Sequence, residues 1–254
     1  IVRLQEKSPH PEGNLINAGI YHFTREIFSY VDRVGCSPRG ELELTDALSL
    51  LMEEGSLRGS LLSSWIDVGF PWDLLPANER LMAGLVRDVR GTLEEGVVIH
   101  GPVQIGEDTL VRSGTYIEGP CSIGKECRIG PHAHLRGSTA IGDGCHIGHC
   151  TEVKNSIVLP GTNLPHFNYL GDSVVGSGCN FGAGTKVANL RHDRAPVRVM
   201  GKDTGRTKMG AIIGDDVQFG INCSVNVGAV IGSRARIAPG AVVEGSIGKD
   251  AEVR

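Results

Sequence analysis

The feature of this sequence that most restricts its fold is an aliphatic residue at every sixth position. The spacing holds for a long run: Ile99, Ile105, Val111, Ile117, Ile123, Ile129, Leu135, Ile141, Ile147, Val153 and Leu159. It resumes at Val175, Phe181 and Val187, and again from Ile213 to Val243. Four residues after most of these positions stands a small residue, usually Thr, Cys or Ala. A short, fixed sequence period indicates a solenoid built from repeated structural units.

Three such repeats would close one triangular coil of 18 residues, with a short strand on each side. Successive coils would stack at the inter-strand distance of about 4.8 Å. The composition agrees, because the 254 residues include 36 glycines and only 5% aromatics, so small side chains must fill the interior. Five cysteines occupy the small-residue position: Cys121, Cys127, Cys145, Cys179 and Cys223. We expect them to pack inside; a metal pair at Cys127 and Cys145, one coil apart, is the less favoured alternative.

Two stretches interrupt the six-residue period. Residues 165–168 are predicted to be an insertion before Tyr169, and residues 188–210 form a long loop rich in Lys and Arg. Long loops on a rigid scaffold are frequent sites of function. We therefore expect functional residues in or near these two segments.

A spacing of 18 places residues at the same turn of successive coils. At one turn the residue after the aliphatic is His100, then Glu118, Arg136 and Lys154. Arg136 and Lys154 should then lie about 5 Å apart. Two cations so close repel unless an anion lies between them, which favours a phosphate ligand held by charge-assisted hydrogen bonds. The alternative is a solvated turn with splayed side chains.

His166 lies in the first of the two interruptions. An imidazole with a near-neutral pKa can accept a proton from an amine or hydroxyl nucleophile. A histidine in a surface loop often has no chemical role, but this one follows the cationic turn in sequence. We therefore treat it as a candidate general base.

Four segments resemble the acetyltransferase half of the bifunctional GlmU-type enzymes, most closely their archaeal members, within the hexapeptide-repeat acyltransferases. The segments are CHIGHCTEVKN (145–155), HFNYLGD (166–172), NFGAGT (180–185) and TKMGAIIGDD (207–216). The resemblance implies a left-handed parallel β-helix, a homotrimer, and transfer of an acetyl group from acetyl-CoA. The implied acceptor is an amino-sugar 1-phosphate, glucosamine-1-phosphate or galactosamine-1-phosphate, in nucleotide-sugar biosynthesis.

The same resemblance implies roles for individual residues. His166 would be the general base, Arg136 and Lys154 would bind the sugar phosphate, and Tyr169 and Asn180 would place the sugar. The remaining active-site contacts would be Lys208 toward the substrate, and Ala183 and Asn189 toward coenzyme A. The sequence departs from the bacterial pattern at Leu190, where those enzymes have Tyr after Asn, so the choice of amino sugar stays open.

Residues 1–85 resemble the second half of a sugar-1-phosphate nucleotidylyltransferase domain, through Glu6-Lys7, Asn17 and the run Trp65–Gly69. The resemblance implies that Glu6, Lys7 and Asn17 line a sugar-phosphate pocket. It also implies that Asp67 helps to hold Mg²⁺ in a complete domain, as suits a carboxylate and a hard cation. The glycine-rich nucleotide loop of such domains is absent, and the first residue is not Met. We expect a fragment that does not itself transfer nucleotides.

The predicted organisation is thus mainly β. Residues 1–90 would be the end of an α/β, Rossmann-like nucleotidylyltransferase domain, with a linker helix over 74–91. Residues 91–254 would be the β-helical acetyltransferase.

Several function classes are disfavoured. A net charge of −4 without charge blocks argues against nucleic acid, and no apolar run reaches the roughly 18 residues of a membrane span. Seven cysteines, an odd number, favour a reducing, cytoplasmic location.

Two alternative functions remain. The β-helix could serve only to oligomerise or regulate a nucleotidylyltransferase, of the glucose-1-phosphate thymidylyl/uridylyl or mannose-1-phosphate guanylyl type. A zinc hydratase on the same fold is suggested by His132, His134, His146 and His149. Zinc needs converging ligands, and no two of these histidines are 18 residues apart, so zinc is disfavoured.

Overall fold

A computed structural model describes the whole chain except residues 2, 5–9, 11–12 and 56. By its internal contacts the chain divides into two units, Ile1–Asp67 and Val68–Arg254. This division lies earlier than the predicted boundary between residues 90 and 91. The predicted linker helix therefore belongs to the second unit.

The first unit contains two helices, α1 (Ile27–Val31) and α2 (Leu44–Glu53), with Ile27, Ala47 and Leu48 buried. No strand occurs among its described residues, although we had expected part of an α/β domain there. A strand is stable only when it pairs with a neighbour. Apolar side chains such as Leu15 and Ile20, at 77% and 72% exposed, accordingly lack a covering layer.

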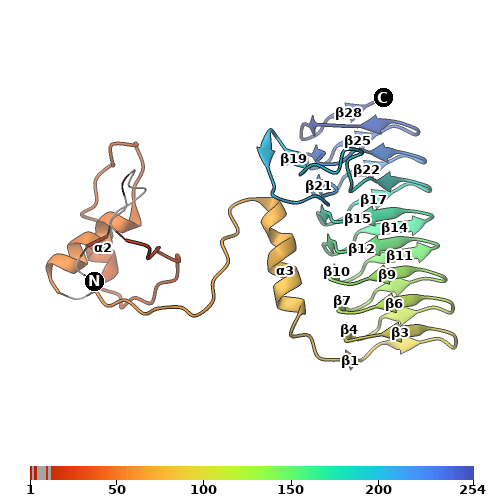
Figure 1. Cartoon of the computed structure of the whole chain (residues 1–254), viewed down its shortest axis with the longest axis horizontal. Helices are drawn as coiled ribbons and strands as arrows, with labels where there is room; N and C mark the ends of the chain where they lie inside the picture. The colour runs from red at the N-terminus through yellow and green to blue at the C-terminus, as the bar shows by residue number, and fades with distance from the viewer. Residues whose placement is uncertain (2, 5–9, 11–12, 56) are drawn as a thin grey trace. The chain divides into compact units, whose positions relative to one another are not determined.

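The second unit is a three-sided parallel β-helix, which confirms the fold class predicted from the hexad period (Figure 1). Sheet A consists of β1 (Asp88–Val89), β4 (Val103–Ile105), β7 (Cys121–Ile123), β10 (Thr139–Ile141), β13 (Ile157–Val158), β16 (Val174–Val175), β21 (Ile212–Ile213), β24 (Val230–Ile231) and β27 (Ser246–Ile247). Sheet B consists of β2 (Thr92–Leu93), β5 (Leu110–Val111), β8 (Arg128–Ile129), β11 (His146–His149), β14 (Asn163–His166), β17 (Asn180–Phe181), β22 (Gln218–Phe219), β25 (Arg236–Ile237) and β28 (Glu252–Val253). Sheet C consists of β3 (Val98–His100), β6 (Tyr116–Glu118), β9 (His134–Arg136), β12 (Glu152–Lys154), β15 (Tyr169–Gly171), β18 (Lys186–Val187), β23 (Ser224–Val225) and β26 (Val242–Val243).

The interior of the β-helix is a single apolar column. Nearly all predicted aliphatic positions are buried in it, and the five cysteines of the small-residue position are buried as well. Several sulfurs donate to backbone carbonyls at the turns; Cys127 Sγ, for example, lies 3.1 Å from the Gly142 oxygen. The cysteines are thus packing residues, as expected.

The predicted period is wrong at one place. Val158, not Leu159, fills the interior after Val153, since Val158 is 1% and Leu159 40% exposed. The turn after Lys154 is one residue shorter than the turn before it, because Ala140 pairs with Ile157 rather than with residue 158. Asn155 makes this tight turn with a positive φ of 44°.

The slip changes the interpretation of residues 165–168. They are not an insertion: His166 is the last residue of β14, in register with His149 of β11. Once the interior positions are counted from Val158, Leu164 and Leu170 follow at the regular spacing of six.

From Ile99 onward, every departure from the six-residue period lies at the turn from sheet C to sheet A. The interior residues on either side of this turn are five apart at Val153–Val158 and at Leu170–Val175, and four apart at Val243–Ile247. The long loop of residues 188–210 leaves the β-helix at the same turn, between β18 and β21. One edge of the β-helix therefore carries all the irregular backbone.

A short helical segment covers this edge. It consists of η1 (Pro71–Asp73) and α3 (Leu74–Met82), which lies alongside the β-helix in Figure 1. The predicted helix over 74–91 ends earlier, at Met82, and its buried face is Leu75 and Met82, whereas Leu81 is 80% exposed.

The long loop folds back under this segment. Its hairpin, β19 (Arg198–Val199) and β20 (Lys202–Asp203), is antiparallel. Val197, Val199 and Met209 join Trp72, Leu75 and Val174 in a second apolar cluster. The loop is thus packed against α3 and sheet A.

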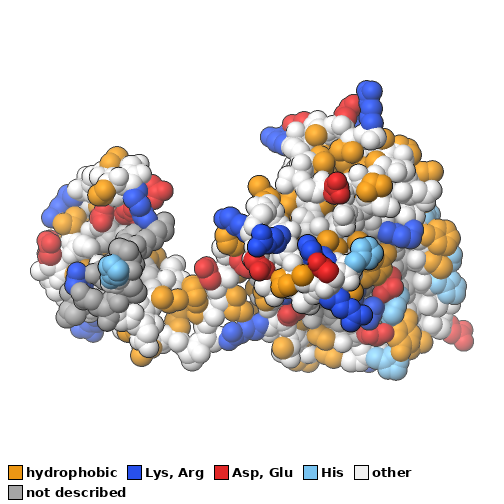
Figure 2. Space-filling model, turned by 45° about the horizontal axis from the view of Figure 1, so that its top comes forward, with side chains coloured by type: hydrophobic (Ala, Val, Ile, Leu, Met, Phe, Trp, Pro, Cys, Tyr) orange, Lys and Arg blue, Asp and Glu red, His pale blue; other side chains and the backbone are white. Residues whose placement is uncertain are grey.

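Charged side chains of both signs are interspersed on the face of the second unit shown in Figure 2. Among the described residues, no helix has both the length and the apolar character needed to cross a bilayer.

Candidate active site

The outer face of sheet C carries the stacked side chains that the 18-residue spacing predicted. His100 is in register with Glu118, and Arg136 is in register with Lys154 on the adjacent coil. The inward neighbours, such as Leu135 and Val153, are fully buried. Strand alternation therefore places Arg136 and Lys154 together on the outside, and this part of the sequence prediction is confirmed.

Each of these cations has its own carboxylate partner. Arg136 Nη1 donates to Glu152 Oε1 at 2.9 Å, and this hydrogen bond raises the pKa of Arg136. Lys154 Nζ lies 3.0 Å from Asp172 Oδ2. The charges are balanced within the chain, so the inference that these two cations require an external anion is wrong. The remaining guanidinium nitrogens of Arg136 make no hydrogen bond to a described residue and stay available to a ligand.

Asp172 was not singled out from the sequence. It follows β15, it is 2% exposed, and its carboxylate accepts hydrogen bonds from Lys154, Asn155 and Asn189. A buried carboxylate is stable only when it is paired and hydrogen-bonded. The sequence offered a signal, since Asp172 lies 18 residues after Lys154, but the shortened turns bring it to Lys154 from the side.

Tyr169 lies on the same outer face, in register with Glu152. Burial raises the pKa of Tyr169, and the nearby carboxylates of Glu152 and Asp172 raise it further. Its hydroxyl lies over Gly171, where the amide of Asn189 also approaches. Four predicted residues, Arg136, Lys154, Tyr169 and Asn189, are thus brought into one cluster.

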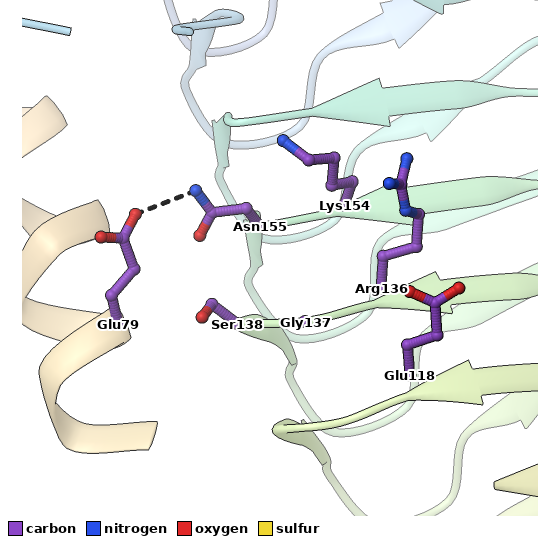
Figure 3. Close-up of a pocket in the computed structure, with 7 residues that line it drawn as sticks. All are labelled: Glu79, Glu118, Arg136, Gly137, Ser138, Lys154 and Asn155. Atoms are coloured by element: carbon purple, nitrogen blue, oxygen red, sulfur yellow. Dashed lines mark hydrogen bonds between the residues drawn. The ribbon is translucent and has the colours of Figure 1, made fainter. Parts of the chain in front are cut away.

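A hollow of about 450 Å³ opens beside this cluster. Figure 3 shows Arg136 and Lys154 on the strands at one side of it and Glu79 of α3 at the other. Its lining residues are Glu79, Glu118, Arg136, Gly137, Ser138, Lys154 and Asn155. The hollow mixes two cations with acidic and amide groups, which suits a polar ligand carrying both signs of charge.

His166 lies at the opposite end of the sheet C strands, before β15 begins, and is exposed. Its backbone oxygen accepts from Gly184 N, which places it beside the run Gly182–Gly184. Its backbone nitrogen donates to the side chain of Asn168 at 3.1 Å. The neighbouring ring of His149 contacts Phe167 edge-on. The backbone at His166 is therefore well fixed while its side chain faces outward.

The other predicted residues are distributed around these two groups. Asn180 is in β17, in register with Asn163 on sheet B. Ala183 is half-buried in the turn beside His166, and Lys208 is exposed, opposite Leu190 in an isolated antiparallel bridge.

In the first unit Asn17 and Asp67 are exposed, and Glu6 and Lys7 lie outside the described residues. Among the residues that are described, no group of three His, Cys, Asp or Glu side chains could hold a metal ion. This gives no support to the zinc alternative, and Asp67 has no second metal ligand beside it.

Comparison with known proteins adds family-level information. Residues 1–84 match the nucleotidyl transferase family, residues 117–226 the GMPPB C-terminal domain, and residues 210–244 the hexapeptide repeat of succinyl-transferase. The chain is 41% identical to the bifunctional protein GlmU of Methanococcus aeolicus over 257 aligned residues, covering 100% of this chain and 62% of that protein. It is 44% identical to the bifunctional sugar-1-phosphate nucleotidylyltransferase/acetyltransferase of Sulfurisphaera tokodaii, covering 97% of this chain and 63% of that protein. The chain thus spans somewhat less than two thirds of these relatives.

Among solved structures, the UDP-N-acetylglucosamine acyltransferase of Francisella novicida is 18% identical, with a TM-score of 0.33. The alignment covers 63% of this chain and 60% of that one. A similarity this low carries no functional information.

Proposed function

Because this chain is a homologue, over its whole length, of the bifunctional GlmU proteins, we propose that its β-helix is an acetyl-CoA-dependent N-acetyltransferase. The acceptor is an amino-sugar 1-phosphate, glucosamine-1-phosphate or galactosamine-1-phosphate. The observation that supports this proposal best is the register of Arg136 with Lys154 beside a polar hollow. It is the one arrangement of paired cations that both the repeat and the family resemblance anticipate.

In this proposal Arg136 and Lys154 bind the phosphate of the acceptor. The guanidinium nitrogens not used by Glu152 can donate to phosphate oxygens. Lys154 supplies a second charge from the next coil, although Asp172 shares it. The acidic residues of the hollow, Glu118 and Glu79, suit the ammonium or hydroxyl groups of an amino sugar.

His166 is proposed as the general base. In its neutral form the imidazole accepts the proton that the acceptor amine loses as the nitrogen bonds to the acetyl carbon. Acetyl-CoA supplies the thioester whose C–S bond breaks. Residues 182–184, Gly-Ala-Gly, lie beside His166 and carry no side chain larger than a methyl group. An extended pantetheine arm can therefore approach this backbone closely, with Ala183 and Asn189 as the proposed contacts.

The experiment is a direct assay of acetyl transfer. Purified protein is incubated with acetyl-CoA and each hexosamine 1-phosphate, and the N-acetylated product is measured by mass spectrometry. His166→Ala should lower kcat by at least about 100-fold, the usual range for loss of a general base. His22→Ala, an exposed histidine of the first unit, is the control and should retain wild-type activity. Absence of turnover with every hexosamine 1-phosphate would contradict the proposal.

A second activity is proposed for the whole protein, because residues 1–84 match the nucleotidyl transferase family. It is sugar-1-phosphate nucleotidylyl transfer, with Mg²⁺ held in part by Asp67. The GMPPB C-terminal domain match over residues 117–226 supports a different role for the β-helix, assembly or regulation of such an enzyme. The acetyl-transfer assay separates the two roles.

We also propose a homotrimer in the cytoplasm. The long loop and the sheet C face lie at one edge of the β-helix, which suits a site completed by a neighbouring copy. All seven cysteines are unpaired, as suits a reducing compartment. Sedimentation equilibrium tests the trimer.

A further inference from the structure

Asp172 is the point at which three segments of the proposed site meet. Its backbone nitrogen donates to the Lys154 oxygen, and its backbone oxygen accepts from Gly210 N at the end of the long loop. Its φ of 48° turns the chain sharply after β15. The residue therefore joins the sheet C strands to the point where the loop of residues 188–210 rejoins the β-helix.

The Asp172 carboxylate is fully used. Oδ1 accepts from Asn155 Nδ2 at 2.9 Å, and Oδ2 accepts from Lys154 Nζ at 3.0 Å and from Asn189 Nδ2. With Asp172 2% exposed and the Lys154 side chain 20% exposed, the ion pair is largely shielded from water. Such a pair is strongly directional, because neither charge can be left unpartnered without a large desolvation cost.

Lys154 therefore has a restricted position. A free lysine side chain samples many rotamers, and ordering it on binding costs free energy. Here the ammonium is already held at the edge of the hollow, with its remaining N–H capacity directed away from Asp172. The same carboxylate holds Asn189, the first residues of the long loop, beside Tyr169.

We propose that Asp172 is a positioning residue that preorganises Lys154 for the phosphate of the acceptor sugar. The role deepens the proposed acetyltransferase function and rests on it. Asp172 does not touch the substrate; it acts through Lys154 and Asn189. Its loss should weaken binding of the sugar phosphate and leave the acetyl-CoA site, at the His166 end of the strands, nearly unchanged.

The test is a double-mutant cycle on ligand binding. Binding of glucosamine-1-phosphate is measured by calorimetry for wild type, Asp172→Asn, Lys154→Ala and the double variant, and KM for acetyl-CoA is measured in parallel. Asp172→Asn should raise the Kd for the sugar phosphate about 10-fold, while KM for acetyl-CoA changes less than about twofold. In the Lys154→Ala background the same change should raise Kd by less than about twofold, because residues that act through one another are non-additive.

Asp250→Asn is the matched control, because Asp250 pairs with Arg234 in an exposed ion pair at a distant coil. It should leave both constants unchanged. Additive effects of Asp172→Asn and Lys154→Ala, or equal changes for both substrates, would show a purely structural role and overturn the proposal. If Asp172→Asn does not fold, Lys154→Met with Asp172→Leu removes the pair together. Its Kd should equal that of Lys154→Ala, and weaker binding would overturn the proposal.

The outcome is separable from that of the proposed function. Binding of the sugar phosphate by wild type without acetyl transfer contradicts the acetyltransferase but leaves the cycle readable. Absence of binding by wild type overturns both.

Discussion

The carboxylate of Glu79 in α3 accepts a hydrogen bond from Arg206, 127 residues later in the chain, at 2.7 Å. The same oxygen accepts from Asn155 Nδ2 at 2.9 Å. Glu79 thus joins three elements at the irregular edge of the β-helix: the covering helix, the shortened turn and the long loop. The hollow of the proposed site lies between them.

This link gives a first prediction. Glu79→Gln keeps the shape but removes the charge, and it should weaken the attachment of residues 188–210. The partners are 37% and 20% exposed, so the cost should be about 1 kcal/mol. Hydrogen exchange of the loop amides should become faster while exchange in sheet B is unchanged. Glu107→Gln, which removes an exposed pairing with Lys125, is the control, and equal loop exchange in both variants would contradict the link.

A second prediction concerns the close approach of coils. A Cβ at Gly106 would lie 2.6 Å from the Gly124 carbonyl carbon, whereas one at Gly248 would meet nothing within 4 Å. Both glycines follow an interior isoleucine of sheet A, so they form a matched pair. Gly106→Ala should destabilise the protein by about 2 kcal/mol through overpacking, and Gly248→Ala should be near neutral. Urea unfolding measures both, and similar values would show that glycine serves turn conformation rather than coil spacing.

The third prediction concerns thiol reactivity. Burial raises the pKa of Cys121 to about 12 and those of Cys145 and Cys179 to about 11. Because thiolate is the reactive form, these thiols should stay unlabelled by iodoacetamide at pH 8. The exposed Cys36 and Cys150 should react. Mass spectrometry should find two labels on the native chain and seven in urea; rapid labelling of Cys145 in the native protein would contradict its interior position.

The extent to which the sequence predicted this molecule follows from what a period can encode. Burial of residues such as Ile117 and Val187 was predicted, because one aliphatic per strand is sufficient to define an interior face. The choice between Val158 and Leu159 was not, because both are aliphatic and the deciding feature is the positive φ of Asn155. Turn length is a backbone property that side-chain pattern does not carry.

The site was predicted unevenly for the same reason. Stacking of Arg136 on Lys154 follows from strand register alone and was confirmed. The partners Glu152 and Asp172 were missed. Glu152 lies in the same strand as Lys154, and Asp172 reaches Lys154 only because two turns are shortened. Catalytic and binding roles remain predictions, since geometry without ligands does not test them.

The fourth prediction concerns pH. Burial, with smaller contributions from Arg128, His166 and Arg112, lowers the pKa of His146 from its ordinary 6.5. The unfolded chain then binds more protons than the folded one below pH 6.5, so stability should fall as the pH drops from there toward the lowered pKa. His146→Gln should reduce this loss between pH 7.5 and 5.5, as measured by urea unfolding. His22→Gln should keep the wild-type pH dependence; identical profiles for all three proteins would contradict a role for His146.

The fifth prediction compares the two stacked cations. Lys154→Met leaves Asp172, 2% exposed, without its counter-charge and with only the amides of Asn155 and Asn189. Removing one partner of a buried pair should cost about 3 kcal/mol. Arg136→Met breaks an ion pair whose partners are 38% and 34% exposed, and it should cost about 1 kcal/mol or less. Thermal and urea unfolding of the two variants test the difference. Equal losses would mean that Lys154 is no more buried than Arg136, and preorganisation by Asp172 would then have no structural basis.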